Sequence, residues 1–200
     1  GPYLKRAAAL TFHPDPEKFV TGAFVKIGYF RGTVDLIYQD EVHGNLFQQV
    51  NQTLDILTTK YLRALISYEG IQRIESLPMP REALREALLN SVVHKSYESN
   101  SAIQIAVFDD RLEIYNSAVL PEDWTIEDLL TSHRSRPYNP DVANVFFRAG
   151  EIESWGRGIQ RIIEACQDEG CPAPTFEYRA GGIWTTFHFG EEYMKGVGLH

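Results

Sequence analysis

The sequence predicts an α+β protein: a two-layer α/β sandwich preceded by a smaller α+β segment. Apolar residues recur with a helical period over residues 46–57, 80–92 and 159–167, so each stretch is expected to form a helix that buries one face. Apolar and polar residues alternate over residues 103–107 and 183–189, which is typical of strands. Helices and strands interleaved in this order favour a layer of helices packed on a sheet.

Composition and charge exclude several classes of protein. The 200 residues are 44% hydrophobic and 12% aromatic, which is enough to bury a core. No apolar run approaches the roughly 20 residues of a membrane span, and no signal peptide opens the chain, so we expect a cytoplasmic protein without a membrane partner. The cysteines, Cys166 and Cys171, are expected to be reduced and structural, because their spacing fits neither a disulfide framework nor a zinc site.

The charge balance argues against nucleic-acid binding by this chain alone. There are 27 acidic and 19 basic residues, a net charge of −8, whereas phosphate affinity comes from clustered Lys and Arg. The sequence opens at Gly1-Pro2 without methionine, so we expect a piece of a longer chain. DNA contact is then more readily expected through an amino-terminal domain outside this sequence.

Residues 1–77 are predicted to form the smaller amino-terminal segment, packed on the next domain. Alternation predicts a strand over residues 24–29, and residues 36–38 fit a further strand. Asn45 is a candidate cap for the helix that follows. Residues 61–77 suit a helix in their first part and a strand in their second, and we favour strand and hairpin, with Gly70 at a turn.

Residues 78–190 are predicted to form the main domain, and residues 191–200 a tail. Pro80 is well placed to begin a helix. Asp109-Asp110 separates two alternating stretches, which predicts a hairpin. Further elements are expected as a helix at 124–130, a polar loop at 133–140, helices at 142–148 and 159–167, and strands at 176–178 and 183–189.

A polar stripe on the helix after Pro80 is the first candidate site. Glu82, Glu86, Asn90 and His94 recur at intervals of four residues and therefore share one face. On spacing alone, an ordinary solvated face is the more frequent explanation by about three to one. The stripe becomes informative only together with motifs further along the chain.

Four short motifs stand in the order in which the GHKL ATPases, the histidine-kinase-type family of the Bergerat fold, carry theirs. The segment Glu86-Ala-Leu-Leu-Asn90 resembles their N-box, and Gly156-Arg157-Gly158 resembles their phosphate loop. The strand ending at Asn116 stands where their adenine-binding motif begins. Thr186 stands where the family places a threonine near the adenine.

The chain is more closely similar to the carboxy-terminal domain of RecG-helicase-related proteins, which often follows a Schlafen-like or AlbA-like domain. The resemblance covers residues 80–187 well and 7–60 loosely. It implies a bacterial transcriptional regulator of the RecG-related type, not a helicase motor, since no G-x-x-x-x-G-K-[ST] loop occurs. The motifs behind it, besides those above, are His94-Lys95-Ser96-Tyr97, Asp110-Arg111-Leu112-Glu113-Ile114, Asn139-Pro140, Phe146-Phe147-Arg148-Ala149-Gly150 and Ile152-Glu153-Ser154-Trp155.

The resemblance implies ATP and Mg²⁺ as cofactors. Glu86 would orient or deprotonate the attacking water, and Asn90 would help hold Mg²⁺. The glycines would let backbone N–H groups approach phosphate at a helix N-terminus, while Asn116 and Thr186 would contact the adenine. The implied lid arginines are Arg134, Arg136 and Arg157, for which a solvated loop is the alternative by about two to one.

Three hypotheses follow for the function. The first is a nucleotide-binding regulatory domain with slow ATPase activity. The second is a degenerate GHKL fold that serves as a homodimerisation or protein-interaction module, because Asn116 and Ala118 replace the aspartate and glycine of the adenine-binding motif. The third is nucleic-acid binding through the Arg-rich loop, which the net charge disfavours. A metal or acid-base role for His94 and His133 is weaker, because no second His or Cys stands at ligand spacing.

Overall fold

A six-stranded sheet in the order β2-β1-β5-β6-β8-β7 forms one layer of the molecule. The computed structural model describes residues 5–131, 136–153 and 156–198. β1 and β5 run parallel, and every other neighbouring pair is antiparallel. The strands are β1 (Val25–Arg31), β2 (Asp35–Val42), β5 (Ile103–Val107), β6 (Arg111–Ser117), β7 (Thr175–Arg179) and β8 (Gly182–His188).

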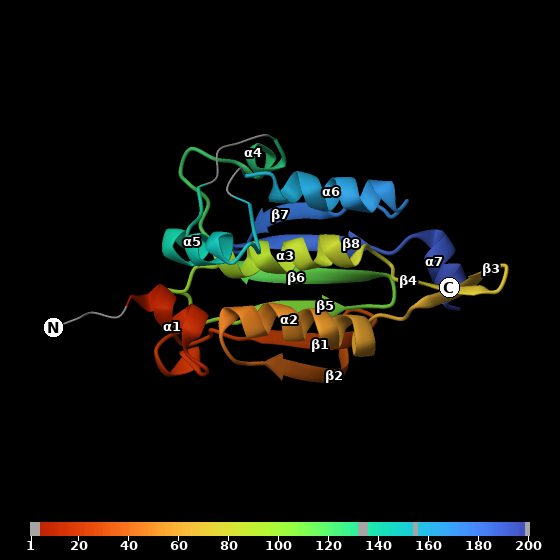
Figure 1. The fold of residues 1–200 in the computed structure, drawn as a ribbon, viewed down its shortest axis with the longest axis horizontal. Coiled ribbons are helices and arrows are strands. Elements are labelled where there is room, and N and C mark those ends of the chain that lie inside the picture. Colours follow the sequence, from red (N-terminus) through yellow and green to blue (C-terminus); the bar gives the residue numbers. More distant parts are fainter. Residues whose placement is uncertain (1–4, 132–135, 154–155, 199–200) are drawn as a thin grey trace.

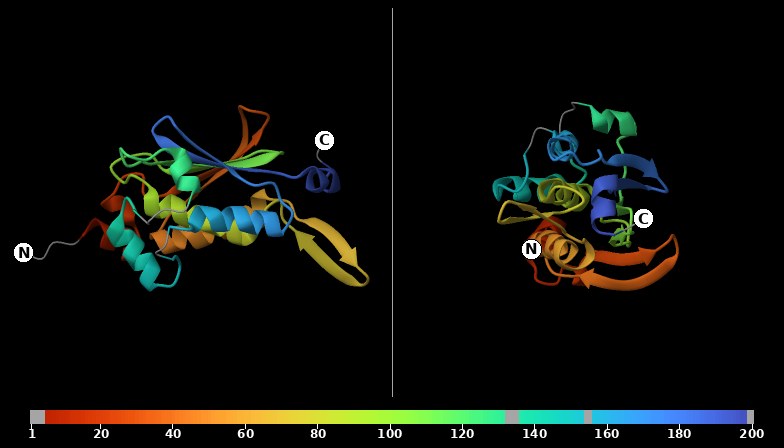
Figure 2. Two further views of the ribbon diagram at one scale, coloured as in Figure 1. Left: turned by 90° about the horizontal axis from the view of Figure 1, so that it is seen from above. Right: turned by 90° about the vertical axis from the view of Figure 1, so that its right-hand side faces the viewer.

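Helices cover one face of this sheet, as Figures 1 and 2 show. The three longest are α2 (Leu46–Ile56), α3 (Arg81–His94) and α6 (Gly158–Asp168), and α3 packs between the other two. The architecture confirms the predicted two-layer α/β sandwich. The shorter helices are α1 (Arg6–Phe12), η1 (Pro16–Lys18), η2 (Leu57–Tyr61), α4 (Ile126–Leu130), α5 (Pro140–Arg148) and α7 (Glu191–Gly196). Among the described residues, no helix has the length and apolar character that crossing a membrane requires.

The strand β1 joins the two ranges that the sequence analysis separated at residues 77 and 78. It lies between β2 and β5, with Ile27 beside Ile105 in the parallel register. Both isoleucines are buried, and one hydrophobic core extends from Leu10 to Tyr193. The amino-terminal segment therefore supplies two strands to the main sheet. Local periodicity identified these strands but carries no information on which distant strand each one pairs with.

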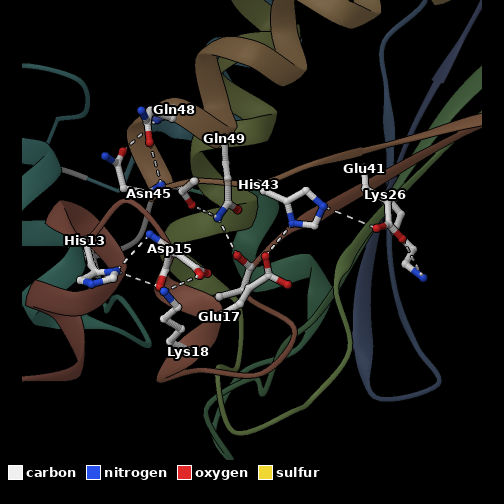
Figure 3. Close-up of polar contacts among 12 residues, drawn as sticks. His13, Asp15, Glu17, Lys18, Lys26, Glu41, His43, Asn45, Gln48 and Gln49 are labelled. Atoms are coloured by element: carbon white, nitrogen blue, oxygen red, sulfur yellow. Dashed lines mark hydrogen bonds and ion pairs between the residues drawn. The ribbon is translucent and has the colours of Figure 1, made fainter.

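Reciprocal side-chain bonds begin α2 at the predicted cap (Figure 3). Asn45 Oδ1 accepts a hydrogen bond from the Gln48 amide, and Gln48 Oε1 accepts one from the Asn45 amide, both at 3.0 Å. Gln49 is buried, and its Nε2 donates to the carbonyls of Ala23 and Gly44 at 2.6 and 2.7 Å. These bonds fix the start of α2 to the segment that leads into β1.

The strands β3 (Leu65–Glu69) and β4 (Gln72–Ser76) form the predicted hairpin, which projects from the body as an arm (Figure 2). Gly70 turns it with a φ of +63°, a left-handed conformation that glycine adopts readily. The range 191–200, expected as a tail, contains α7 at the base of this arm. The Tyr193 hydroxyl donates to the Arg63 carbonyl at 2.6 Å, and α7 thereby attaches to the chain entering β3.

The short helix α5 is held by one buried ring and one amide. Phe146 is fully buried and stacks on Phe47 of α2, with 4.3 Å between ring centroids. Asn139 Nδ2, just before α5, donates to the carbonyls of Val93 and Lys95 at 2.9 and 2.7 Å. These are carbonyls at the end of α3 that have no partner within the helix, so α5 and α3 are fixed to each other.

Replacement of Phe146 by alanine is expected to lower the free energy of unfolding by about 3–5 kcal/mol, because it leaves a cavity under α5. The neighbouring Phe147 is 49% exposed, so Phe147→Ala is the matched control and should cost less than about 1 kcal/mol. Urea unfolding followed by circular dichroism measures both. Equal losses for the two variants would contradict the anchoring role of Phe146.

Candidate functional site

A cavity of about 520 Å³ lies between the helices and the sheet, a volume typical of sites for small molecules. Its floor is formed by the sheet residues Asn116, Ile183 and Thr185. The segment after β6, with α4, forms another wall. The helix residues that line it are Ala87, Asn90, Ser91 and His94 of α3 and Gly158, Ile159 and Ile162 of α6.

A second, smaller cavity of about 50 Å³ adjoins the first and carries its charged groups. Asn90, His94, Gly156 and Gly158 line both cavities. Glu86, Glu153, Arg157 and Arg161 line only the smaller one. The two cavities together present a largely apolar region that continues into a region of mixed charge.

The two helices of the site come close together at Gly158, the first residue of α6. A Cβ atom on Gly158 would lie 2.6 Å from Glu86 Oε1 and 2.9 Å from Asn90 Nδ2. A side chain at this position would displace the ends of Glu86 and Asn90, so the contact as it stands favours glycine. Gly156 precedes it with a φ of +68°, which also favours glycine. The structure therefore brings together the stripe on α3 and the glycine loop that the sequence analysis selected separately.

Within the described residues, the N-terminus of α6 has no side-chain cap. Arg157 is the N-cap residue and makes no capping hydrogen bond, and the first turn contains no acidic residue. The first N–H groups of a helix have no partners within it and carry the positive end of the helix dipole. Since Gly158 and Ile159 line the cavity, this helix start can bind an anion there.

Glu86 is a partly desolvated carboxylate beside that helix start. Burial is the largest effect and raises its pKa from the ordinary value of 4.5, while the nearby charges of Arg161 and Arg85 oppose the shift. Arg85 is itself ion-paired with Glu151. A carboxylate held in this way is more basic than an exposed one, which suits it to accept a proton from a water molecule.

Two arginines at the mouth of the smaller cavity share one carboxylate. Arg161 Nη2 lies 2.5 Å from Glu153 Oε1, and Arg157 Nη2 lies 3.7 Å from Glu153 Oε2. All three side chains are about half exposed, so these pairs contribute little stability and can exchange for another anion. Arg161 was not among the predicted residues, although its position four residues after Arg157 places it on the same helix face.

The other predicted arginines lie on the opposite wall or outside the described residues. Arg136 lines the main cavity, is exposed and pairs with Asp123 at 3.1 Å. Its guanidinium also lies 5.5 Å from the centre of the Trp124 ring. Arg134 and His133 fall in the range 132–135, outside the described residues.

Asn116 brings an unpartnered polar group to the floor of the cavity. It is 4% exposed, and its Nδ2 is buried without a hydrogen-bond partner. Burial of an amide donor without a partner costs free energy, which an acceptor on a ligand would recover. Ala118, Val119 and Leu120 continue the lining after it, and Ile162 and Ile183 add apolar surface.

The threonine in the cavity is Thr185, one residue before the expected Thr186. Thr185 lies opposite Ile114 in the antiparallel register and is buried, whereas Thr186 lies opposite Glu113. Successive residues of a strand point to opposite faces, so Thr186 faces away from the helices. The sequence motif identified the strand, but the face depended on the register with β6.

Two further titratable side chains, those of Lys95 and Cys166, are buried in the fold and are not assigned to the site. Lys95 is 1% exposed, its Nζ lies 4.6 Å from the centre of the Tyr97 ring, and burial lowers its pKa to about 8. Burial also raises the pKa of the Cys166 thiol to about 11, which disfavours the reactive thiolate. No cluster of three or more His, Cys, Asp or Glu residues suited to a metal occurs within the described residues.

Comparison with known proteins agrees with this geometry. Residues 100–187 match the family described as "Putative ATP-dependent DNA helicase recG C-terminal". The crystal structure of the DIP2311 protein from Corynebacterium diphtheriae is similar in fold, with a TM-score of 0.80 and 21% identity over 94% of this chain. The chain spans only 38% of the length of that protein. None of the curated proteins matches the sequence.

The family match begins after α3 and ends within β8, and so includes Asn116, the glycine loop and Thr185. This agrees with the order of motifs from which the resemblance was predicted. The predicted resemblance is therefore confirmed as a match: residues 100–187 are similar to the RecG carboxy-terminal family, which fits a RecG-related, GHKL-like ATPase domain.

Proposed function

We propose that the two adjoining cavities bind ATP together with Mg²⁺, and that the chain is a nucleotide-dependent regulatory domain. The observation that carries this proposal is the contact at Gly158, where Glu86 and Asn90 lie against the uncapped start of α6. Phosphate groups are favoured at such a helix start. A carboxylate and an amide oxygen beside the same point are suited to handling water and Mg²⁺.

Different residues of the two cavities suit the base, the polyphosphate and the Mg²⁺ of the nucleotide. The apolar surface of Ile162 and Ile183, with the free amide of Asn116, suits a purine base. The N–H groups at the start of α6, with Arg157 and Arg161, suit the polyphosphate. Asn90 lines both cavities and would supply one oxygen to Mg²⁺, which keeps water and phosphate as its other ligands.

Slow hydrolysis of the bound nucleotide is part of this proposal. Glu86 would accept a proton from the attacking water, since burial leaves its carboxylate more basic than an exposed one. The regulated process would then depend on the parent protein. We place the chain in a cytoplasmic, RecG-related bacterial regulator that contacts DNA through another domain and does not act as a helicase motor.

A second proposed function is self-association through the β3–β4 arm. An isolated two-stranded hairpin has little stability in water and gains stability by packing against another surface. This hairpin leaves two large apolar side chains uncovered, since Ile66 is 49% exposed and Tyr68 is 68% exposed. Their cross-strand partners on the same face are Glu75 and Arg73. The same face carries Arg73 and Glu75, which pair with each other within β4 at 2.6 Å. In a two-fold contact with a second copy, each of them would also meet the opposite charge of the partner.

Calorimetric titration with a non-hydrolysable ATP analogue and Mg²⁺ is expected to show binding with a Kd below about 1 mM. Asn90→Ala should weaken binding about tenfold or more, because a polar contact to a charged ligand is lost. Asn144→Ala, on the exposed side of α5 where Asn144 bonds Arg148, is the matched control and should bind normally. Absence of binding at millimolar analogue would overturn the proposed nucleotide site.

Glu86→Gln is expected to reduce ATP turnover by about 100-fold or more while leaving the affinity for the analogue nearly unchanged. The control is Glu82→Gln, an exposed position one turn earlier on α3. In the unchanged protein, turnover should fall as the pH drops through the raised pKa of Glu86, at a pH above the ordinary 4.5, because only the ionised carboxylate accepts a proton. Full turnover by Glu86→Gln would remove this residue from the reaction.

Sedimentation equilibrium tests whether the chain self-associates through the β3–β4 arm. The unchanged chain is expected to form dimers in a concentration-dependent manner, and the double change Ile66→Ser with Tyr68→Ser should leave monomers. Arg73→Glu should also weaken association, and adding Glu75→Arg should restore it, because the exchange recreates both the pair within β4 and the opposite charges across a two-fold contact. Val34→Ser, at a residue 86% exposed elsewhere, is the control. Monomers at all concentrations would exclude the arm as a dimer contact.

A further inference from the structure

We infer that Asn116 relaxes the choice of purine at this site, so that 6-oxopurine nucleotides bind about as well as adenine nucleotides. The inference rests on the proposed nucleotide site and concerns only the recognition of the base. It starts from one side chain: Asn116, at the end of β6, is buried in the cavity floor with its Nδ2 unpartnered.

The hydrogen-bonding edges of adenine and of a 6-oxopurine, at positions 1 and 6 of the ring, explain why one amide can bind both bases. An amide presents a donor and an acceptor side by side. Adenine offers a donor at its 6-amino group and an acceptor at N1, whereas a 6-oxopurine offers an acceptor at O6 and a donor at N1. Rotating the Asn116 amide by half a turn exchanges its nitrogen and oxygen, and Nδ2 has no hydrogen-bond partner among the described residues that the rotation would break. The same side chain can therefore pair with either edge.

A carboxylate at this position would behave differently. An ionised carboxylate only accepts hydrogen bonds, so it would pair with the 6-amino group of adenine and repel the O6 of a 6-oxopurine. The GHKL pattern has an aspartate where this chain has Asn116. The substitution thus removes the group that would reject the oxo edge.

The hydroxyl of Thr185, which also lies on the cavity floor, does not create a preference for adenine over a 6-oxopurine. Thr185 is 8% exposed, and its hydroxyl can either donate or accept. The nearby lining residues Ile162 and Ile183 are apolar and contact either base equally. The charged lining residues Glu122 and Arg136 are exposed, so water and salt screen their effect on the buried amide of Asn116.

Calorimetric titration of the whole chain with ADP and with IDP, each with Mg²⁺, tests the inference. The two nucleotides differ only in the edge at C6 and N1. We expect dissociation constants within about fivefold of each other, because each base makes one two-bond pair with the amide. In Asn116→Asp, the preference for ADP over IDP should rise about tenfold or more, because a mismatched edge then faces the carboxylate.

The outcomes separate this inference from the proposed function. ADP binding more than about 30-fold tighter than IDP in the unchanged chain would overturn the relaxed choice and leave the nucleotide site intact. An unchanged ratio in Asn116→Asp would overturn the role of Asn116. Failure of both nucleotides to bind the unchanged chain would overturn the site itself and the inference with it.

A second variant covers the case in which a buried aspartate prevents folding. Asn116→Ser keeps a group that both donates and accepts, so its ADP-to-IDP ratio should stay within about fivefold of one even where affinity falls. A strong ADP preference in Asn116→Ser would contradict the inference. Thermal unfolding of each variant establishes that the titrated protein is folded.

Discussion

The contact between α3 and α6 at Gly158 is the constraint on which the site depends. With hydrogen as its side chain, this residue lets the start of α6 approach the Glu86 carboxylate and the Asn90 amide to a distance that no Cβ would allow. A helix start that is uncapped and free of acidic side chains is thereby placed next to two polar groups from a different part of the chain.

The candidate site as a whole is costly in electrostatic terms, which is typical of functional sites. Burial raises the pKa of Glu86 and leaves the Nδ2 of Asn116 without a partner, and neither feature stabilises the folded chain. The folded chain is stabilised by contacts outside the candidate site. Phe146 stacked on Phe47, the amide of Asn139 on the end of α3, and the capped start of α2 hold the helices from outside the cavity.

The ion pairs beside the smaller cavity are weak enough for an incoming anion to replace the carboxylate of Glu153. Glu153 pairs with Arg157 and Arg161 on the surface, where ion pairs contribute little and water competes readily. An incoming polyphosphate would offer these guanidinium groups a stronger partner than one carboxylate. The net charge of −8 therefore does not prevent a local anion site, because the few basic groups that matter are concentrated at one helix start.

Sequence alone determined the local structure and the identity of several site residues. Helical periods, the Asn45 cap and the hairpin at Gly70 depend on near neighbours in the chain, so pattern was sufficient to predict them. The order of motifs likewise selected Glu86, Asn90 and the glycine loop. Only the tertiary structure decided that β1 lies beside β5 and that Thr185 rather than Thr186 faces the cavity. Each of these depends on strand register or helix packing between distant segments, which the spacing of residues along the chain does not encode.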